Sequence, residues 1–166
     1  MRALAADGLT LEPQVAAHAA ELFPVLRDPR LYTFTDDSEP VSEAWLRERF
    51  ARLESRRSPD GSQHWLNWVV RDASGAAVGY VQATVAADGE AEIAYVFGRQ
   101  YWRRGYGFAA CTAVIAELAA AYGVTRVTAT LDPDNAASLA LLKKLGLGLV
   151  EESAEAHEVI FARDLR

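Results

Sequence analysis

The chain has 166 residues, of which 51% are hydrophobic and 24% are charged, and its formal net charge is -6 at pH 7. This length supports one domain with a single sizeable core. The acidic balance argues against nucleic acid as a main partner, because binding to a phosphate backbone needs a dominant basic face; a cationic acceptor such as an amine suits the chain better.

The first third of the chain predicts a short strand and two helices. Residues 9–12 alternate like a strand that Pro13 ends. Residues 14–26 are rich in alanine and predict a helix disturbed near Pro24. A second helix is expected to start near Ser42. Its apolar face would consist of Trp45, Leu46, Phe50 and Leu53.

The middle of the chain changes to the period of strands. Residues 65–71 and 78–85 predict two strands joined by a turn over residues 72–75. Asp88-Gly89 then turns the chain into a third strand over residues 92–97. The three strands predict an antiparallel meander.

The last third predicts a helix, a strand and a second helix. Apolar residues spaced three and four apart line one side of the first helix: Phe108, Cys111, Ile115, Leu118 and Tyr122. Gly123 is placed to end that helix. A strand follows over residues 124–131. The second helix is expected over residues 135–145, with Asp134 or Asn135 as its N-cap.

Two closing strands are expected over residues 147–151 and 159–165. A meander followed by strand–helix–strand–helix predicts a mixed α+β sheet. The crossover should set residues 124–131 parallel to residues 92–97. Ligands of such sheets favour the crevice beyond the carboxyl ends of the strands.

The segment from Gly98 to Gly107, Gly-Arg-Gln-Tyr-Trp-Arg-Arg-Gly-Tyr-Gly, lies at that end. A glycine-spaced turn at the start of a helix presents unpaired backbone N–H groups to an anion. Gly105 and Gly107 would let the backbone approach a ligand closely, because neither has a Cβ. Three arginines beside these glycines in an acidic chain indicate a phosphate-bearing ligand. The segment therefore predicts a pyrophosphate cradle.

Residues 92–147 resemble the GNAT superfamily of N-acetyltransferases, especially its ribosomal-protein-alanine and related N-terminal acetyltransferase branch. Members show Arg or Gln, two residues, Gly, one residue, then Gly or Ala; the run from Trp102 to Gly107 fits at the glycines, with Trp102 in the first slot. A second motif, Asn135-Ala136-Ala137-Ser138 ahead of Leu145-Gly146-Leu147, resembles the family's Asn-x-x-Ser or Asn-x-x-Ala ahead of Leu-Gly-Phe. The resemblance implies one GNAT domain over residues 1–166, with a mostly antiparallel sheet of about six or seven strands and about four helices.

The resemblance also implies acetyl-CoA as co-substrate, an amine acceptor and no metal. Backbone N–H groups of residues 103–108 would hold the pyrophosphate, and Arg99, Arg103 and Arg104 would neutralise phosphates. The backbone of residues 95–97 would pair with the pantetheine arm, and Asn135 would contact that arm or its loop. The implied cofactor-binding set is Tyr95, Val96, Phe97, Arg103, Arg104, Gly105, Tyr106, Gly107, Phe108 and Asn135.

Direct transfer to a primary amine needs a base, an oxyanion donor and a proton for the departing thiolate. Glu92, on the strand beside the thioester, is the expected base, and Glu158 is a second choice. A backbone N–H of residues 92–97 is the expected oxyanion donor. Many relatives use a tyrosine in the helix after the Asn, but residues 139–142 contain none, so Ser138 is the hydroxyl left for the acid role. A thiolate is a tolerable leaving group, and catalysis could also proceed without a dedicated acid.

Two other functions are left open. The run from Gly105 to Ala110 also fits the dinucleotide pattern G-x-G-x-x-A of NAD(P)-dependent oxidoreductases, and Asp132 follows the next strand. Against that interpretation, seven residues separate Phe97 from Gly105, and the upstream half is a meander. A non-catalytic acyl-CoA-binding or sensing module is suggested by the missing tyrosine.

The single cysteine, Cys111, excludes an internal disulfide and is expected in the core. His18, His64 and His157 lack metal-ligand spacing and are expected to be surface or hydrogen-bonded residues. With neither a leader nor an apolar run long enough to span a bilayer, a cytoplasmic protein without a membrane partner is expected. The acceptor stays open among a protein N-terminus, a polyamine, an amino acid and an antibiotic, and an apolar edge on the last strands would suit a homodimer.

Overall fold

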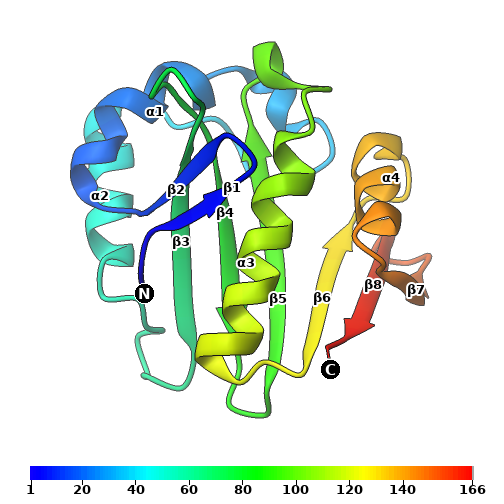
Figure 1. Cartoon of the computed structure of the whole chain (residues 1–166). Helices are drawn as coiled ribbons and strands as arrows, with labels where there is room; N and C mark the ends of the chain where they lie inside the picture. The colour runs from blue at the N-terminus through cyan, green and yellow to red at the C-terminus, as the bar shows by residue number, and fades with distance from the viewer. Residues whose placement is uncertain (166) are drawn as a thin grey trace.

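Over residues 1–165, which the computed structural model describes, the chain forms one eight-stranded sheet in the order β1-β2-β3-β4-β5-β6-β8-β7 (Figure 1). The strands are β1 (Leu4–Ala6), β2 (Leu9–Pro13), β3 (His64–Arg71), β4 (Ala77–Val85), β5 (Glu90–Phe97), β6 (Arg126–Leu131), β7 (Gly148–Ser153) and β8 (Glu158–Asp164). The α-helices are α1 (Ala19–Leu26), α2 (Glu43–Leu53), α3 (Tyr106–Tyr122) and α4 (Ala136–Lys144), and the 3-10 turns are η1 (Ala16–His18), η2 (Pro29–Tyr32) and η3 (Arg99–Tyr101).

The sheet is mixed and mostly antiparallel, as the sequence predicts. Among the described strands, β5 and β6 form the one parallel pair. Helix α3 crosses one face of the sheet, and α1 and α2 cover the other (Figure 1). The oxidoreductase alternative is wrong, because a dinucleotide-binding fold needs several parallel strands joined by crossover helices.

The sheet has one strand more than expected. Residues 4–6 are too short to show an alternating pattern, and β1 exists because it pairs with β2 through a tight turn at Asp7-Gly8. Gly8 has φ 79 in that turn, a conformation that glycine adopts at no steric cost. A hairpin partner therefore creates a strand that the local sequence does not announce.

The helix expected over residues 14–26 begins later than predicted. The backbone N–H of Gln14 still donates to the Asn67 carbonyl of β3 at 2.9 Å, so the chain leaves the sheet only after this residue. The N–H of Val15 donates to Nδ1 of His18 at 3.0 Å, which closes the turn η1 instead of an α-helical turn. Pro24 lies inside α1, which ends two residues later.

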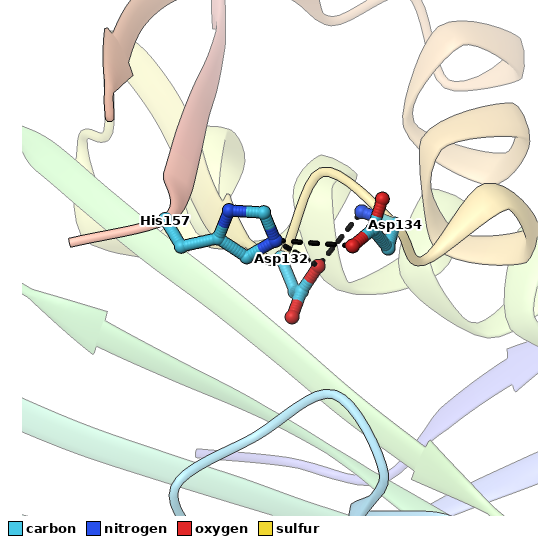
Figure 2. Close-up of side chains that lie close together, drawn as sticks. All are labelled: Asp132, Asp134 and His157. Carbon is cyan, nitrogen blue, oxygen red and sulfur yellow. Dashed lines mark hydrogen bonds and ion pairs between the residues drawn. The ribbon is translucent and has the colours of Figure 1, made fainter. Parts of the chain in front are cut away.

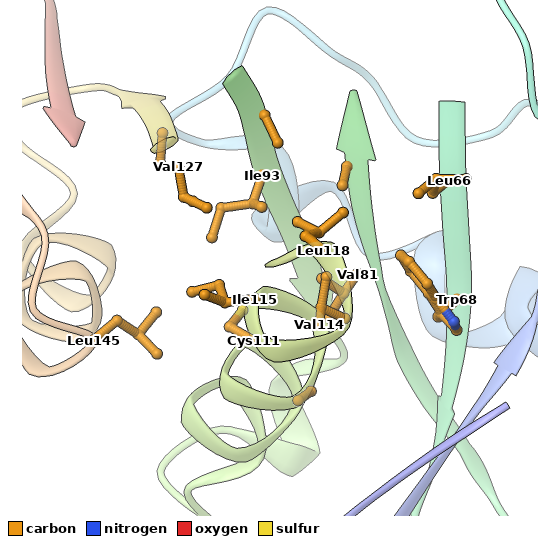
Figure 3. Close-up of a cluster of buried hydrophobic side chains, with 14 of the residues drawn as sticks. Leu66, Trp68, Val81, Ile93, Cys111, Val114, Ile115, Leu118, Val127 and Leu145 are labelled. Carbon is orange, nitrogen blue, oxygen red and sulfur yellow. The ribbon is translucent and has the colours of Figure 1, made fainter. Parts of the chain in front are cut away.

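The main core lies between α3 and the sheet (Figure 3). Helix α3 contributes Cys111, Val114, Ile115 and Leu118, and the strands contribute Trp68, Val81, Ile93 and Val127. Phe108 and Tyr122, which the predicted stripe includes, are only half-buried. Burial raises the pKa of the Cys111 thiol to about 12, so Cys111 is a packing residue, as expected.

Strand β7 is an edge of the sheet, and its apolar side chains are exposed. Leu149 is 49% and Val150 is 53% exposed, which matches the apolar edge expected of the last strands. The homodimer stays a prediction. Among residues 1–165, no helix combines the length and the apolarity that crossing a membrane requires.

Candidate functional site

Strands β5 and β6 pair over three residues and then separate. Glu90, Ala91 and Glu92 of β5 lie opposite residues 126–128 of β6. From Ile93 onward, the rest of β5 forms no pairing with the described residues of β6. Figure 1 shows the two strands diverging toward the end of the sheet where α3 and α4 begin. The edge of β5 from Ile93 onward is therefore open toward β6.

The direction of each backbone group along β5 follows from its pairing with β4. The N–H of Gly98 donates to the Val78 carbonyl at 3.0 Å, and the N–H of Ala86 donates to the Glu90 carbonyl at 2.9 Å. The register between these two pairs has no shift. Because hydrogen-bonded pairs alternate in an antiparallel ladder, the even-numbered residues of β5 bond to β4.

The odd-numbered residues Ile93, Tyr95 and Phe97 therefore turn their N–H and C=O groups toward the gap. The expectation that the backbone of Val96 pairs with a pantetheine arm is wrong, because that backbone points to β4. The indole N–H of Trp102 donates to the Phe97 carbonyl at 2.7 Å. Both backbone groups of Tyr95 and the N–H of Phe97 remain for an extended ligand.

The amino end of α3 carries backbone donors without internal partners. Among residues 1–165, the N–H groups of residues 103–108 meet no backbone or side-chain acceptor, and the first bond of this turn runs from Ala109 N–H to the Gly105 carbonyl at 3.1 Å. Arg103 has φ 61 and Gly105 has φ 80. Such left-handed residues curl successive N–H groups into a concavity that suits an anion.

Arginines surround these free N–H groups. The guanidinium of Arg99 lies 5.6 Å from the ring centre of Trp102, and that of Arg104 lies 5.7 Å from the ring centre of Tyr101. Arg103 is exposed. Within the described part of the chain, no ion pair engages any of the three. Their charge is therefore available to a phosphate group.

The two glycines of the turn have different structural roles. A Cβ at Gly105 would meet no atom of the described residues within 4 Å, and its φ of 80 is a conformation that favours glycine. A Cβ at Gly107 would lie 2.9 Å from Cδ2 of Leu141 on α4. The bare Cα of Gly107 therefore lets α4 pack against α3. The expectation that Gly107 also lets the backbone approach a ligand stays a prediction.

Helix α4 packs against β6 and against α3 near its amino end. Asn135 is its N-cap, with Oδ1 accepting from the Ser138 N–H at 3.1 Å, which decides between Asn135 and Asp134. The amide NH2 of Asn135 remains for a ligand. Burial raises the pKa of the Tyr95 phenol to about 12, and hydrogen bonding by the Ser138 hydroxyl opposes part of that shift. Although residues 139–142 of α4 contain no tyrosine, Tyr95 of β5 thus lies beside Ser138.

Glu92 lies where the strands part. It is exposed, it is the last β5 residue paired with β6, and no hydrogen bond or ion pair of its carboxylate is formed within residues 1–165. Glu158 starts β8, four residues before Ala162, the β8 residue opposite Thr128. Four strand residues span roughly 13 Å, so Glu158 is far from the point of divergence. The geometry favours Glu92 over Glu158.

The face of the sheet on which Glu92 lies follows from its neighbours. Val96 and Tyr80 pack with α1 and α2, whereas Ile93 and Phe97 pack with α3. Because successive side chains of a strand alternate between faces, Glu92 points to the side of α1 and α2. A base on this side would meet an acceptor that enters between these helices and the sheet.

Figure 2 shows a cluster that the sequence does not reveal: His157, Asp132 and Asp134. Nε2 of His157 lies 3.1 Å from Oδ2 of Asp134 and 3.5 Å from Oδ1 of Asp132. The cluster ties the β7–β8 turn to the loop that precedes α4. His157 is thus a hydrogen-bonded surface histidine, as expected, but its partners are 23 and 25 residues away and give no spacing signal.

A protein-family model described as an acetyltransferase (GNAT) domain matches residues 8–148. Among solved structures, a ribosomal L7/L12 α-N-protein acetyltransferase in complex with coenzyme A has a TM-score of 0.82 and 16% identity, with 98% of each chain covered. The ribosomal-protein-S5-alanine acetyltransferase from Vibrio fischeri has a TM-score of 0.80 and 14% identity, with 98% of this chain and 96% of that chain covered. A GNAT-family acetyltransferase from Bacillus anthracis has a TM-score of 0.78 and 17% identity, with 98% of each chain covered. At these identities the likeness concerns the fold alone. No curated protein sequence matches the chain.

Proposed function

Since this chain belongs to the GNAT family of acetyltransferases, which use acetyl-CoA, we propose that it transfers the acetyl group to a primary amine by direct attack, with residues 1–166 as one domain. The observation that carries the proposal is the set of free N–H groups of residues 103–108 at the amino end of α3. Helix N-termini with free donors are binding sites for phosphate groups.

The residues around the gap fit the parts of acetyl-CoA. The free N–H groups and the unpaired Arg103 and Arg104 suit the pyrophosphate. The backbone of Tyr95 suits the amides of the pantetheine arm, and we assign the free amide NH2 of Asn135, at the start of α4, to the same arm or its loop. When bound, acetyl-CoA supplies an acetyl group activated as a thioester.

The chemistry needs proton transfers at two atoms. We assign Glu92 as the base that takes a proton from the attacking amine, directly or through one water. We assign Ser138 as the donor to the departing thiolate, with the phenol of Tyr95 beside it. A phenol with a pKa of about 12 stays protonated at neutral pH and can replace the proton of the serine. A backbone N–H group of β5 that points toward the gap between β5 and β6 would donate a hydrogen bond to the oxyanion.

Calorimetric titration tests the cradle. Acetyl-CoA should bind, and acetyl-pantetheine, which lacks the diphosphate, should bind much more weakly. No detectable binding of acetyl-CoA at millimolar concentration, or equal affinity for the two compounds, would show that these N–H groups do not bind the diphosphate. Thiol release that depends on an amine acceptor then measures transfer; tight cofactor binding without release across a broad amine panel would indicate a non-catalytic module.

A further inference from the structure

A groove beside the second half of α2 is lined by arginines and tryptophans. It lies between α2, the segment of residues 55–59 and the start of β3, and its cavity volume is about 580 Å³. Its charged and aromatic lining residues are Arg49, Arg52, Arg57, Trp45 and Trp65, and the others are Leu53, Ser55, Ser58 and Pro59. The lining contains no carboxylate among the described residues.

The positive charge of this groove is not neutralised. Over residues 1–165, Arg49, Arg52 and Arg57 enter no ion pair, whereas Arg47 on the same helix binds Glu43 at 2.6 Å. Among the described residues, the guanidinium of Arg57 donates only to the Gly61 carbonyl, at 3.2 Å. A groove with one sign of charge on a chain of net charge -6 attracts ligands of the opposite sign.

Aromatic surface accompanies that charge. Trp45 is 37% exposed, and the guanidinium of Arg49 lies 5.7 Å from the centre of its ring. Tryptophan and arginine are the side chains enriched where proteins bind other polypeptides. The lining therefore resembles a peptide-binding surface more than a site for a free inorganic anion.

The register of the sheet connects this groove to the proposed base. Trp65 of β3 lies opposite Thr84 of β4, and Thr84 lies opposite Glu92 of β5. Residues directly opposite one another share a face, so all three point to the side of α1 and α2. Two strand spacings separate Trp65 from Glu92, which is about 10 Å. An extended peptide crosses that distance in about three residues.

We propose that the acceptor is an acidic polypeptide N-terminus, whose α-amine meets Glu92 and whose carboxylates at about the third to fifth residues bind Arg49, Arg52 and Arg57. This inference rests on the proposed acetyl transfer and names its substrate class. The amide N–C bond forms as the thioester C–S bond breaks, the amine proton passes to Glu92, and the thiolate takes the proton of Ser138. A polyamine would be repelled by three guanidinium groups, and a free amino acid is too short to reach them.

The test compares peptides of equal length that differ only in the third to fifth residues. Ala-Ala-Glu-Glu-Glu, Ala-Ala-Gln-Gln-Gln and Ala-Ala-Lys-Lys-Lys are assayed for acceptor-dependent thiol release, beside spermidine and free alanine. The glutamate peptide should have a kcat/KM about tenfold or more above that of the glutamine peptide, and the advantage should shrink as salt screens the charges.

Variants locate the effect on the groove. Arg52→Gln with Arg57→Gln should raise KM for the glutamate peptide about tenfold, with kcat and acetyl-CoA affinity near wild type. The control is Arg47→Gln, which removes one positive charge from α2 outside the groove and should leave KM unchanged. Circular dichroism checks that each variant folds.

Equal use of the glutamate and glutamine peptides, or a preference for spermidine or free alanine, would overturn the inference and leave acetyl transfer in place. An unchanged KM in the double variant would do the same. Absence of thiol release with every amine would overturn the proposed function, and this inference with it.

Discussion

Gly107 of α3 and Leu141 of α4 touch at the point where the two helices meet, since a Cβ on Gly107 would lie 2.9 Å from Cδ2 of Leu141. The contact sets how close α4, with Asn135 and Ser138, comes to the amino end of α3. Gly107, the second glycine of the turn, thus contributes to helix packing, whereas Gly105 supplies the positive φ of the turn.

The contact predicts an energetic coupling. Gly107→Val should destabilise the fold by about 1–3 kcal/mol, because the added side chain meets Leu141. Combining it with Leu141→Ala should cost less than the sum of the single changes, with a coupling of about 1 kcal/mol. Urea unfolding of the four proteins measures this. Strictly additive free energies of unfolding would show that the two side chains do not meet.

Charge reversal at Arg104 should weaken acetyl-CoA binding. Arg104→Glu sets a like charge beside the proposed phosphate position, and the Kd measured by calorimetry should rise about tenfold or more. Arg47→Glu, on α2 and away from the turn, is the control and should leave the Kd unchanged. The same Kd for the Arg104 variant and wild type would mean that the phosphates lie elsewhere.

Glu92→Gln should lower kcat about a hundredfold while the Kd for acetyl-CoA changes little. The amide keeps the shape of the carboxylate but cannot take the proton of the amine. Glu158→Gln is the matched control, because that carboxylate lies far along β8 from the point where β5 and β6 part. Wild-type turnover in the Glu92 variant would end its assignment as the base.

Ser138→Ala and Tyr95→Phe should each lower kcat about tenfold, and the double variant should be little slower than either, because the two hydroxyls serve one proton transfer. Leu139→Met, next to Ser138 and without a hydroxyl, is a control for packing. Full turnover in both single variants would indicate that the thiolate leaves without a dedicated acid.

Alkaline stability should report the buried acids. The pKa of Tyr95 is raised to about 12 from 10.0, and that of Cys111 to about 12 from 9.0, both by burial. The folded state therefore keeps protons that the unfolded state releases. Their contribution to stability is complete below about pH 9 and is lost as the pH rises toward 12. Cys111→Ala with Tyr95→Phe should flatten the decline of the melting temperature between pH 9 and 12; an unchanged slope would assign the decline to other groups.

Local signals in the chain predict many of the helix boundaries. Ser42 caps α2, with Oγ accepting from the Trp45 N–H at 3.1 Å, and Gly123 ends α3 with φ 66. Both features involve residues within one turn of each other. The free N–H groups at the start of α3 could be predicted for the same reason, because a helix always leaves its first donors unpaired unless a neighbour caps them.

The sequence by itself determined the α+β class, the glycine turn and a helix cap at Asp134 or Asn135, since caps, turns and side-chain periods depend on neighbours in the chain; the structure decides the cap in favour of Asn135. Tertiary structure alone decided that the backbone of Val96 bonds to β4 and that His157 contacts Asp134. It also decided that Trp65, which lines the groove, lies in register with Glu92 across the sheet. These relationships depend on strand register and on helix packing between distant segments. No local pattern specifies them, because a shift of one residue would turn each side chain to the opposite face.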